Sequence, residues 1–249
     1  MPGAGLDSCR YALCLDVDGT ILDLAPSPEA VTVPAGLMPL LGRLSAQFDG
    51  ALAFVSGRSI GAIDQLFAPL KLPAVGVHGG EMRTPDGEIV RDERLAAELA
   101  ALKPRLAEAL ADMLGVVLED KHSAIALHYR NAPQHARPLL KAARSILRGG
   151  ASGLALREGK CVLEIRPRHL TKGRALSRLL QLAPFSGRTA IYAGDDTTDE
   201  DAFEVVNRHG GISIRVGDPA PTAATYRLPD PETFRRWLIE LAQGQRGTA

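Results

Sequence analysis

The sequence predicts an α/β fold, in which a Rossmann-like parallel sheet has helices on both faces and carries an inserted α+β module. In the first and last parts of the chain, short apolar runs alternate with helical patterns, which is typical of such a sheet. In the middle, pairs of apolar strands are separated by helices instead. We therefore expect a core made of residues 1–81 and 168–249, with the module at about residues 82–167.

The first part of the chain contains three predicted strands, at residues 12–15, 51–55 and 74–77. Between the first two, a helix is expected after Pro34, because four leucines share one of its faces: Leu37, Leu40, Leu41 and Leu44. Ser59 is placed to cap the helix that follows the second strand.

The last part repeats this alternation. A helix is predicted over residues 172–182, a strand over 189–193, a helix over 200–207 and a strand over 211–216.

The middle part begins with a predicted hairpin turn, TPDG, between residues 83 and 88. An amphipathic helix follows, which Pro104 is expected to interrupt, and its apolar face consists of Leu95, Leu99, Leu102, Leu106 and Leu110. The remaining elements are two strands, a helix and two further strands, at residues 116–120, 124–130, 134–147, 155–158 and 162–166.

Composition narrows the class of protein. The 29 acidic and 29 basic residues balance, so overall charge favours neither nucleic acid nor an anionic membrane as a partner. No apolar run is long enough to cross a bilayer, and the first residues lack the pattern of a signal peptide. The three cysteines are scattered and show no metal-ligand spacing. We expect a cytoplasmic monomer whose partner is a small molecule.

The strongest chemical signal is the segment DVDGT, which directly follows the first strand. Ligands of open α/β sheets bind beyond the carboxyl ends of the strands. There Asp16 can attack phosphorus to form an aspartyl-phosphate, while Asp18 can protonate the leaving group and then deprotonate water. Gly19 permits a tight turn, and Thr20 offers a hydroxyl and a backbone N–H to phosphate. The alternative is an ordinary Asp-Gly turn that closes a strand.

A second signal is GDDTTDE, which places four acids within seven residues after another apolar strand. Such carboxylates repel one another unless a cation neutralises them, and Mg²⁺ prefers oxygen ligands. Asp195, nearest the strand, is the best candidate for a direct ligand. Asp196 and Asp199 are expected to bind through water or to orient the site. The alternative is an acidic helix start, because acidic residues favour helix N-termini.

Two further segments fit the same site. Ser56, Gly57 and Arg58 follow the second strand and can supply a hydroxyl and N–H groups to phosphate oxygens. Lys172 opens a helix and can offset the charge of the nucleophile and of the transferring group. A serine at a strand end or a lysine at a helix start is ordinary by itself, whereas the ordered set of four segments is improbable by chance.

In this order DVDGT, VSGR, TKG and GDDTTDE resemble the four motifs of the haloacid dehalogenase-like hydrolase superfamily. The resemblance implies a metal-dependent phosphotransferase with Asp16 as nucleophile and Asp18 as general acid and base. It also implies Ser56 and Lys172 on the phosphate. Magnesium would be bound by Asp16, Asp195 and the backbone carbonyl of Asp18.

Strand alternation in the module collects polar side chains on one sheet face. The opposite face is apolar and is expected to lie under the two module helices. The polar face consists of Glu119, Lys121, His128, Arg130, Glu164 and Arg166. It either meets water, as in many antiparallel sheets, or closes over the core site as a lid that hydrogen-bonds sugar hydroxyls.

The segments LEDKHSAIALHYRNAP, VHGGE and GKCVLEIRP resemble those of the trehalose-6-phosphate phosphatase family. This resemblance implies that Glu119, Lys121, Lys160 and Glu164 hold the glucose unit distal to the phosphate. His128 and Arg130 would order the lid or contact the substrate, and His78 would lie at the mouth of the core. One departure is Thr171, where the family often has Asn or Asp, but a hydroxyl can fill the same capping role.

The function implied is magnesium-dependent hydrolysis of trehalose 6-phosphate to trehalose and phosphate, a step of trehalose biosynthesis. A phosphatase of another sugar phosphate, such as sucrose 6-phosphate or mannosyl-3-phosphoglycerate, would use the same chemistry. A phosphomutase also forms an aspartyl-phosphate and uses a lid. The intact Asp16, Asp18, Lys172 and Asp195 argue against an inactive sugar-phosphate sensor.

Overall fold

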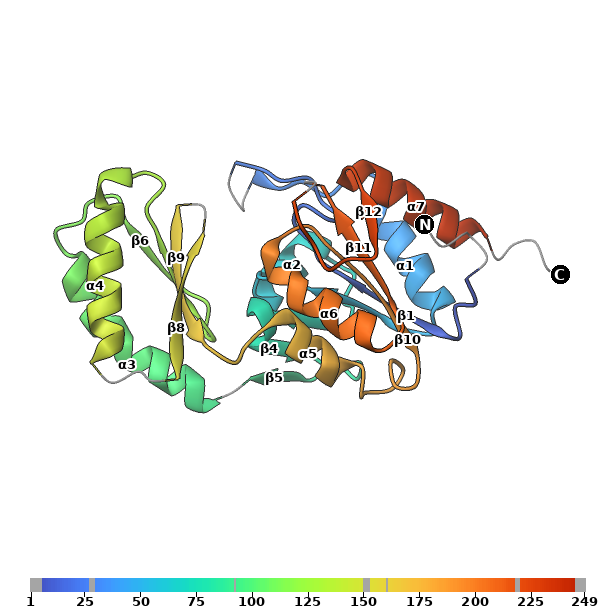
Figure 1. Ribbon diagram of the computed structural model, residues 1–249, viewed down its shortest axis with the longest axis horizontal. Helices are drawn as coiled ribbons and strands as arrows, with labels where there is room; N and C mark the ends of the chain where they lie inside the picture. The colour runs from blue at the N-terminus through green and yellow to red at the C-terminus, as the bar shows by residue number, and fades with distance from the viewer. Residues whose placement is uncertain are drawn as a thin grey trace. The chain divides into compact units, whose positions relative to one another are not determined.

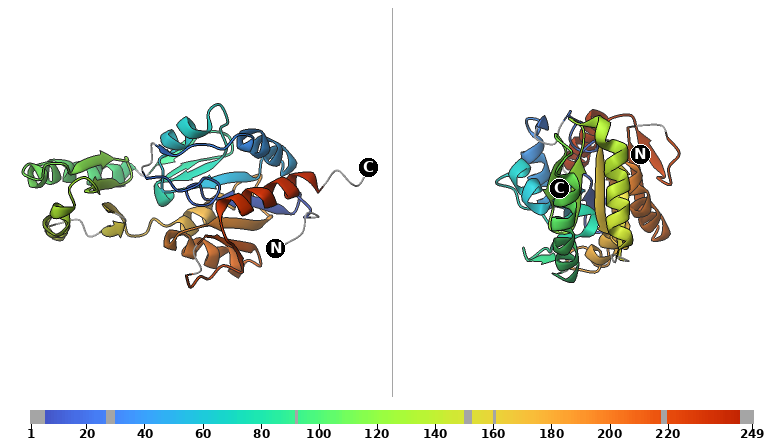
Figure 2. Two further views of the ribbon diagram at one scale, coloured as in Figure 1. Left: turned by 90° about the horizontal axis from the view of Figure 1, so that it is seen from above. Right: turned by 90° about the vertical axis from the view of Figure 1, so that its left-hand side faces the viewer.

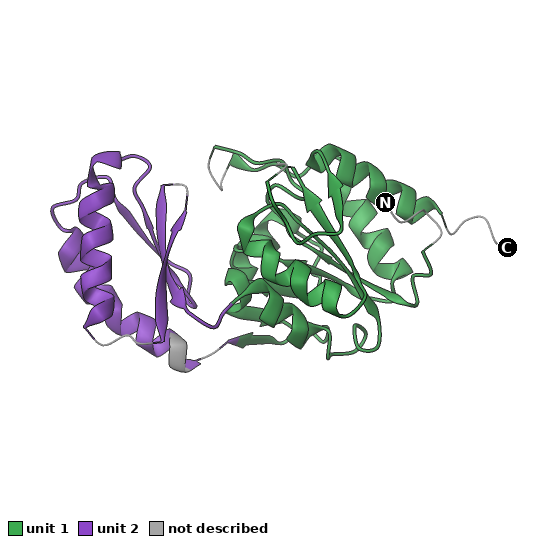
Figure 3. Ribbon diagram, viewed as in Figure 1, with its two compact units in different colours: residues 1–90, 171–249 green, residues 91–170 purple. Residues whose placement is uncertain are grey.

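The computed structural model describes residues 6–26, 30–91, 93–149, 153–159, 161–217 and 220–244. The chain forms two compact units (Figure 3). Unit 1 comprises Met1–Val90 and Thr171–Ala249, and unit 2 comprises Arg91–Leu170. Each unit has its own cluster of buried apolar side chains. Among the described helices, none combines the length and the hydropathy of a membrane span.

Unit 1 is built on a sheet of eight strands in the order β12-β11-β10-β1-β2-β3-β4-β5 (Figure 1). The strands from β12 to β3 are parallel, and β4 pairs antiparallel with β3. Their bounds are β1 Tyr11–Leu15, β2 Leu52–Val55, β3 Ala74–Gly76, β4 Glu81–Arg83, β5 Ile89–Arg91, β10 Thr189–Gly194, β11 Ile212–Val216 and β12 Tyr226–Leu228.

Helices cover both faces of this sheet. Figure 2 (left) shows α1 and α2 on one side of it, and α5 and α6 on the other. Helix α7 packs against α1. The bounds are α1 Leu37–Gln47, α2 Ile60–Phe67, α5 Lys172–Leu179, α6 Glu200–Arg208 and α7 Pro231–Gln243. The predicted α/β class, with a parallel sheet between two helical layers, is therefore confirmed.

Local signals explain where these helices begin. The predicted leucine stripe of α1 is buried. The Ser59 side chain caps α2 by accepting the Ala62 N–H (3.2 Å), and Thr171 caps α5 by accepting the Arg174 N–H (3.3 Å). The hydroxyl at position 171 thus has the capping role that its residue type predicted.

The predicted insertion point at residue 82 is corrected by the edge strands of unit 1. TPDG forms the expected turn, since the Thr84 N–H donates to the Glu88 carbonyl and the Gly87 N–H to the Thr84 carbonyl (both 2.9 Å). However, β4 and β5 extend the core sheet beyond β3 instead of starting the module. Met82 is buried in the core cluster, so this hairpin is bound to unit 1 by both backbone pairing and apolar packing.

No element was predicted for the segment that forms β12 and α7. Its helix nevertheless has clear local signals. Asp230 caps it by accepting the Thr233 N–H (2.7 Å), and Pro231 stands at its first position. Its buried side chains are Phe234, Trp237, Leu238 and Leu241.

Unit 2 is a two-layer α+β structure. Its antiparallel sheet has the order β6-β7-β9-β8, with β6 Val117–Asp120, β7 Ile125–His128, β8 Leu154–Gly159 and β9 Val162–Pro167. Helices α3 (Glu93–Leu110) and α4 (Ala136–Arg148) lie on one face of this sheet (Figure 1). The apolar strand residues on that face join both helices in one cluster.

The prediction that Pro104 interrupts its helix is wrong, because α3 runs continuously through this residue. A proline inside a helix costs roughly 3 kcal/mol. Leu99, Leu102 and Leu106 are buried in the unit 2 cluster, and full burial of a leucine stabilises by roughly 1.5–3 kcal/mol. Burial of these three side chains therefore outweighs the cost of the proline.

Candidate active site

The sequence-predicted residues of the core meet at one edge of the unit 1 sheet. In the strand register, Leu15 of β1 lies between Phe54 of β2 and Ala193 of β10. Asp16, Ser56 and Asp195 follow the carboxyl ends of these three neighbouring strands. Asp16 and Ser56 are 4% and 1% exposed. The chain thus places a buried carboxylate and a buried hydroxyl where ligands of open α/β sheets bind.

Lys172 links two carboxylates of this site. Its Nζ donates to Asp16 Oδ1 at 2.8 Å and to Asp199 Oδ1 at 2.7 Å. The Thr20 hydroxyl donates to Asp16 Oδ2 at 3.2 Å. Asp16 therefore has a donor on each oxygen, one from its own turn and one from the start of α5.

The three aspartates of GDDTTDE occupy different environments. Asp199 is fully buried, and Asp196 is exposed and caps the short 3₁₀ helix η4 (Thr197–Asp199). Asp195 lies against the turn after β1, because a Cβ on Gly19 would come within 2.0 Å of Asp195 Oδ2. Gly19 also has a φ of +74°. Glycine is required here both by the left-handed backbone and by the close approach of a carboxylate.

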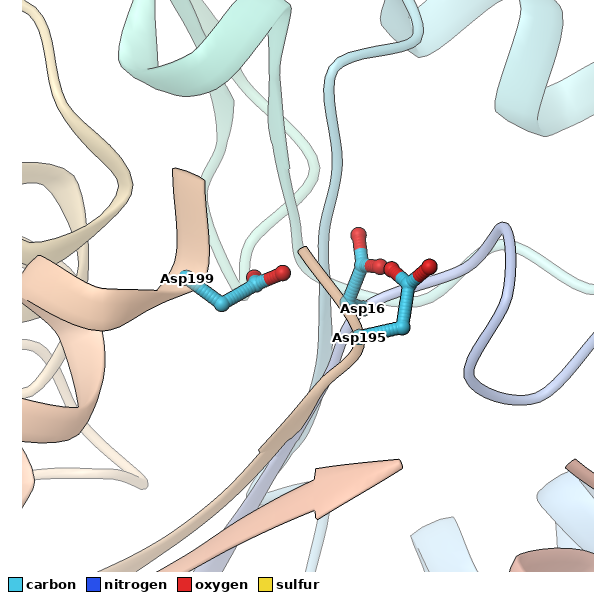
Figure 4. A group of neighbouring side chains, drawn as sticks. All are labelled: Asp16, Asp195 and Asp199. Atoms are coloured by element: carbon cyan, nitrogen blue, oxygen red, sulfur yellow. The ribbon is translucent and has the colours of Figure 1, made fainter. Parts of the chain in front are cut away.

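Carboxylates of Asp16, Asp195 and Asp199 form a group that could hold a metal ion, with one oxygen of each within 4.8 Å of the others. Figure 4 shows Asp16 and Asp195 side by side, with Asp199 coming from the following turn. Among the described residues, the ammonium that contacts this group is that of Lys172, so three ionised carboxylates would leave excess negative charge. Oxygen ligands with uncompensated negative charge suit a hard divalent cation.

The pKa values reflect this crowding. Burial raises the pKa of Asp16 well above its ordinary value, and Asp199 and Asp195 raise it further against the opposing effect of Lys172. Burial and Asp199 raise the pKa of Asp195 to about 6. Burial alone would lower the pKa of Lys172, but Asp16 and Asp199 outweigh it and hold that pKa above its ordinary value. A divalent cation would relieve the repulsion that raises both carboxyl pKa values.

The side chain of Arg58 contacts Asp18, and its backbone contacts Ser56 in its own loop. Its Nε donates to Asp18 Oδ2 at 2.7 Å and its Nη2 to Asp18 Oδ1 at 2.8 Å. This is the bidentate geometry that a guanidinium makes with a carboxylate. The Arg58 backbone N–H also donates to Ser56 Oγ at 3.2 Å. From the sequence, Arg58 was expected to contact phosphate. Its pairing with Asp18 was not predicted, because 40 positions separate the two residues.

His78 lies against the same loop. The His78 N–H donates to the Ser56 carbonyl (3.0 Å), and the Val77 N–H to the Arg58 carbonyl (2.9 Å). A Cβ on Gly57 would come within 2.5 Å of His78 Nε2. Val77 and His78 have φ values of +48° and +53°, which non-glycine residues rarely adopt and which are frequent at functional sites.

Glu119, His128 and Glu164 lie in strands on the sheet face opposite the helices of unit 2, and Lys121 follows β6. Glu119 and Glu164 both lie opposite Ala126 in the register of β6, β7 and β9. Lys121 Nζ lies 3.4 Å from Glu164 Oε1, and His128 Nε2 lies 2.8 Å from Glu119 Oε2.

The other predicted residues of unit 2 are Arg130, Lys160 and Arg166, and Arg166 Nε lies 3.9 Å from Glu164 Oε2. Arg130 is exposed in the turn after β7, and Lys160 lies outside the described residues. Sequence reasoning missed Arg157, an exposed residue opposite Glu164 in the β8–β9 register. The same alternation applied to residues 154–159 would have found it.

Comparison with known proteins places the chain among phosphatases. A family model described as trehalose-phosphatase matches residues 14–232. A probable trehalose-phosphate phosphatase of Sinorhizobium fredii is 44% identical over 237 residues, which are 95% of this chain and 89% of that protein. The trehalose-6-phosphate phosphatase of Escherichia coli is 41% identical over 234 residues, or 93% and 86% of the two chains.

Solved structures agree on the fold. A trehalose-6-phosphate phosphatase related protein superimposes with a TM-score of 0.78 at 28% identity, covering 94% of this chain and 99% of that one. The C-terminal domain of the Candida albicans trehalose-6-phosphate phosphatase has a TM-score of 0.75 at 22% identity, covering 94% and 92%.

Proposed function

The chain belongs to the trehalose-phosphatase family, and from this premise we propose that it hydrolyses trehalose 6-phosphate to trehalose and phosphate. Membership makes the chain a phosphomonoesterase. The observation that supports the proposed mechanism best is the contact between Lys172 Nζ and Asp16 Oδ1, at 2.8 Å and at the carboxyl end of β1. A buried carboxylate beside a buried ammonium suits a nucleophile that receives a phosphoryl group.

In the first half-reaction, a carboxylate oxygen of Asp16 attacks phosphorus. The new O–P bond gives an aspartyl-phosphate, while the bond between phosphorus and the sugar oxygen breaks. Asp18, in its protonated form, gives its proton to that oxygen, and trehalose leaves as the alcohol. Ser56 and Lys172 donate hydrogen bonds to the phosphoryl oxygens as charge redistributes.

In the second half-reaction, Asp18 takes a proton from a water molecule as the water oxygen attacks phosphorus. The acyl–phosphate bond breaks, phosphate leaves, and Asp16 is restored as a carboxylate. The proton that Asp18 gave to the sugar is thereby recovered from water, so the cycle consumes one substrate and one water molecule.

We propose Mg²⁺ as the cofactor, bound by Asp16, Asp195 and the backbone carbonyl of Asp18. When bound, Mg²⁺ would supply positive charge that lowers the repulsion between the nucleophile and the phosphoryl oxygens. Asp199 is better suited to anchoring Lys172 than to binding metal, because its two oxygens already accept three hydrogen bonds.

The polar face of unit 2 is proposed to select the sugar. Glu119, Lys121 and Glu164 present carboxylates and an ammonium that can hydrogen-bond sugar hydroxyls, and Lys160 is proposed to join them. In this proposal Arg130 and His128 order the face, and His78 and Thr20 contact the substrate from the core. Unit 2 would then act as a specificity cap.

A phosphate-release assay over several sugar phosphates, with and without Mg²⁺, tests this function. We expect trehalose 6-phosphate to be hydrolysed with the highest kcat/KM, only in the presence of the metal. Asp16→Asn should lower kcat by several orders of magnitude without changing the far-UV circular dichroism spectrum. Equal turnover of sucrose 6-phosphate and mannosyl-3-phosphoglycerate would refute the substrate assignment, and an active Asp16→Asn would refute the nucleophile.

A further inference from the structure

Asp199 accepts hydrogen bonds from three groups. Its Oδ1 accepts from Lys172 Nζ at 2.7 Å and from the Tyr192 hydroxyl at 2.5 Å. Its Oδ2 accepts from the Asp196 N–H at 3.0 Å. Asp199 is 0% exposed. Because a buried carboxylate is costly unless donors surround it, these three groups together determine its orientation.

Tyr192 reaches Asp199 from inside the sheet. It lies in β10, and its ring is fully buried against Phe203 of α6, with ring centroids 5.7 Å apart and planes at 72°. This packing restricts the ring to one position, so the hydroxyl is held in place before any substrate binds. Burial, and next the Asp199 carboxylate, raise the pKa of Tyr192 well above its ordinary value, so the phenol remains a hydrogen-bond donor.

The orientation of Asp199 matters because Lys172 is shared. Its Nζ lies almost equally far from Asp199 Oδ1 and Asp16 Oδ1, at 2.7 and 2.8 Å. A rotation of the Asp199 carboxylate would therefore change where the ammonium lies relative to Asp16. Of the three donors to Asp199, the Tyr192 hydroxyl is the one that can be removed by a single substitution while leaving charge and backbone intact.

We propose that Tyr192 is a positioning residue for phosphoryl transfer: its hydroxyl holds Asp199 in the orientation that keeps the Lys172 ammonium on Asp16. The inference rests on the proposed function, because Lys172 is assigned there to the transferring phosphoryl group. Tyr192 itself touches neither the nucleophile nor the substrate in this account.

Tyr192→Phe removes only the hydroxyl and tests the proposal. Since a hydrogen bond to a charged group is involved, we expect kcat to fall about ten-fold. The fall should be equal for trehalose 6-phosphate and p-nitrophenyl phosphate, because both need the nucleophile, with KM changed less than about two-fold. Tyr11→Phe is the matched control, since Tyr11 lies in the neighbouring strand β1 and no described residue is hydrogen-bonded to its hydroxyl. Its kcat should stay at the wild-type value.

A double-mutant cycle shows whether Tyr192 acts through Asp199. In an Asp199→Ala background, Tyr192→Phe should change kcat less than about two-fold. A full ten-fold effect in that background would overturn the proposal, as would an unchanged kcat in the single variant. A loss of kcat that merely follows the unfolded fraction measured by thermal melting would also overturn it.

A crystal structure of Tyr192→Phe tests the same idea without turnover. We expect the Asp199 carboxylate to rotate and Lys172 Nζ to move beyond hydrogen-bond distance of Asp16, and an unmoved Lys172 would overturn the inference. If the wild type hydrolyses only p-nitrophenyl phosphate, the proposed substrate fails, while the cycle and the crystal structure still decide the role of Tyr192.

Discussion

At the scale of single residues, the pair of Arg58 and Asp18 changes the view of the VSGR segment. A guanidinium presents two parallel N–H groups, which match the two oxygens of a carboxylate, whereas an ammonium is a point charge. The pair therefore fixes both the position and the plane of the Asp18 carboxyl group. In the proposed mechanism one oxygen of this group leaves Arg58 to carry a proton to the leaving oxygen, so Arg58 should matter most when that oxygen needs a proton.

Arg58→Lys should therefore discriminate between leaving groups. We expect kcat/KM for trehalose 6-phosphate to fall about ten-fold or more, since general acid catalysis contributes roughly 10²–10⁴-fold. The value for p-nitrophenyl phosphate should change much less, because nitrophenolate leaves without a proton. Asp18→Ala should show the same pattern more strongly. Equal losses on both substrates would place Arg58 on the phosphate instead.

Asp195 makes the stability of the metal-free protein depend on pH. Its folded pKa of about 6 lies above the ordinary value of 3.8. Between these values the folded chain binds more protons than the unfolded chain, so the contribution of Asp195 to the free energy of unfolding falls as pH rises. Wild type should thus lose stability relative to Asp195→Asn between about pH 4 and pH 6.

Urea denaturation at several pH values, in the presence of a chelator, measures this difference. We expect added Mg²⁺ to stabilise the wild type above pH 6 and to affect Asp195→Asn far less. A difference between the two proteins that is constant from pH 4 to pH 7 would show that Asp195 titrates normally.

At the scale of elements, the neighbouring acids in the turn after β10 have different structural roles. Asp196 and Asp199 form a reciprocal capping box at the start of η4. The Asp196 side chain accepts the Asp199 N–H, and the Asp199 side chain accepts the Asp196 N–H. Asp196 is exposed, whereas Asp195 faces Asp16. The run of acids is therefore both a candidate metal site and a helix start. Asp195 belongs to the candidate metal site, and Asp196 caps the helix.

Asp196→Ala should accordingly affect stability more than catalysis. Loss of an N-cap side chain costs about 1 kcal/mol, which chemical denaturation can measure. We expect the Mg²⁺ concentration that gives half-maximal activity to change less than about two-fold. A large increase in that concentration would instead make Asp196 part of the metal site.

The sheet of unit 2 offers a matched pair of glutamates for testing the specificity face. Glu164 lies on the face with Lys121, whereas Glu158 pairs with Arg144 of α4, on the helix side. We expect Glu164→Ala to lower kcat/KM for trehalose 6-phosphate about ten- to hundred-fold, as for a lost hydrogen bond to a charged group. Its effect on p-nitrophenyl phosphate should stay within about two-fold.

Glu158→Ala is the control and should leave both substrates at wild-type values. Glu119→Ala should behave like Glu164→Ala. Similar losses on both substrates in the Glu164 variant would indicate a destabilised unit and not a lost contact with the sugar.

At the scale of the whole molecule, the two units have separate apolar clusters. Small domains bury a smaller fraction of their surface than large ones and are less stable. We therefore expect unit 2 to unfold at a lower urea concentration than unit 1. The single tryptophan, Trp237, lies in unit 1, so fluorescence reports that unit, whereas circular dichroism reports both.

The two signals should consequently give transitions at different urea concentrations. Leu127 lies in the unit 2 cluster, so Leu127→Ala should lower the free energy of unfolding of unit 2 by about 2–5 kcal/mol. The first transition should then move to a lower urea concentration, while the fluorescence transition stays in place. Coincident transitions in both proteins would mean that the units unfold together.

Much of the fold could be predicted because its signals are local. Apolar runs mark the buried strands, and Ser59 marks a helix start that depends only on its nearest neighbours. The role of Pro104 and the place of β4 and β5 were predicted wrongly, because burial of distant side chains and pairing with β3 outweighed the local tendency. The elements β12 and α7 were not predicted, although Asp230 and Pro231 signal the start of that helix.

The sequence by itself determined which segments bear the chemistry, since acids, hydroxyl and lysine stand at strand and helix ends that short patterns identify. Only the tertiary structure decided which side chains meet: Arg58 with Asp18, Tyr192 with Asp199, and Lys172 between two carboxylates. The physical reason is that an element's type depends on neighbours along the chain. A hydrogen bond between distant residues depends instead on how strands are ordered and how side chains pack.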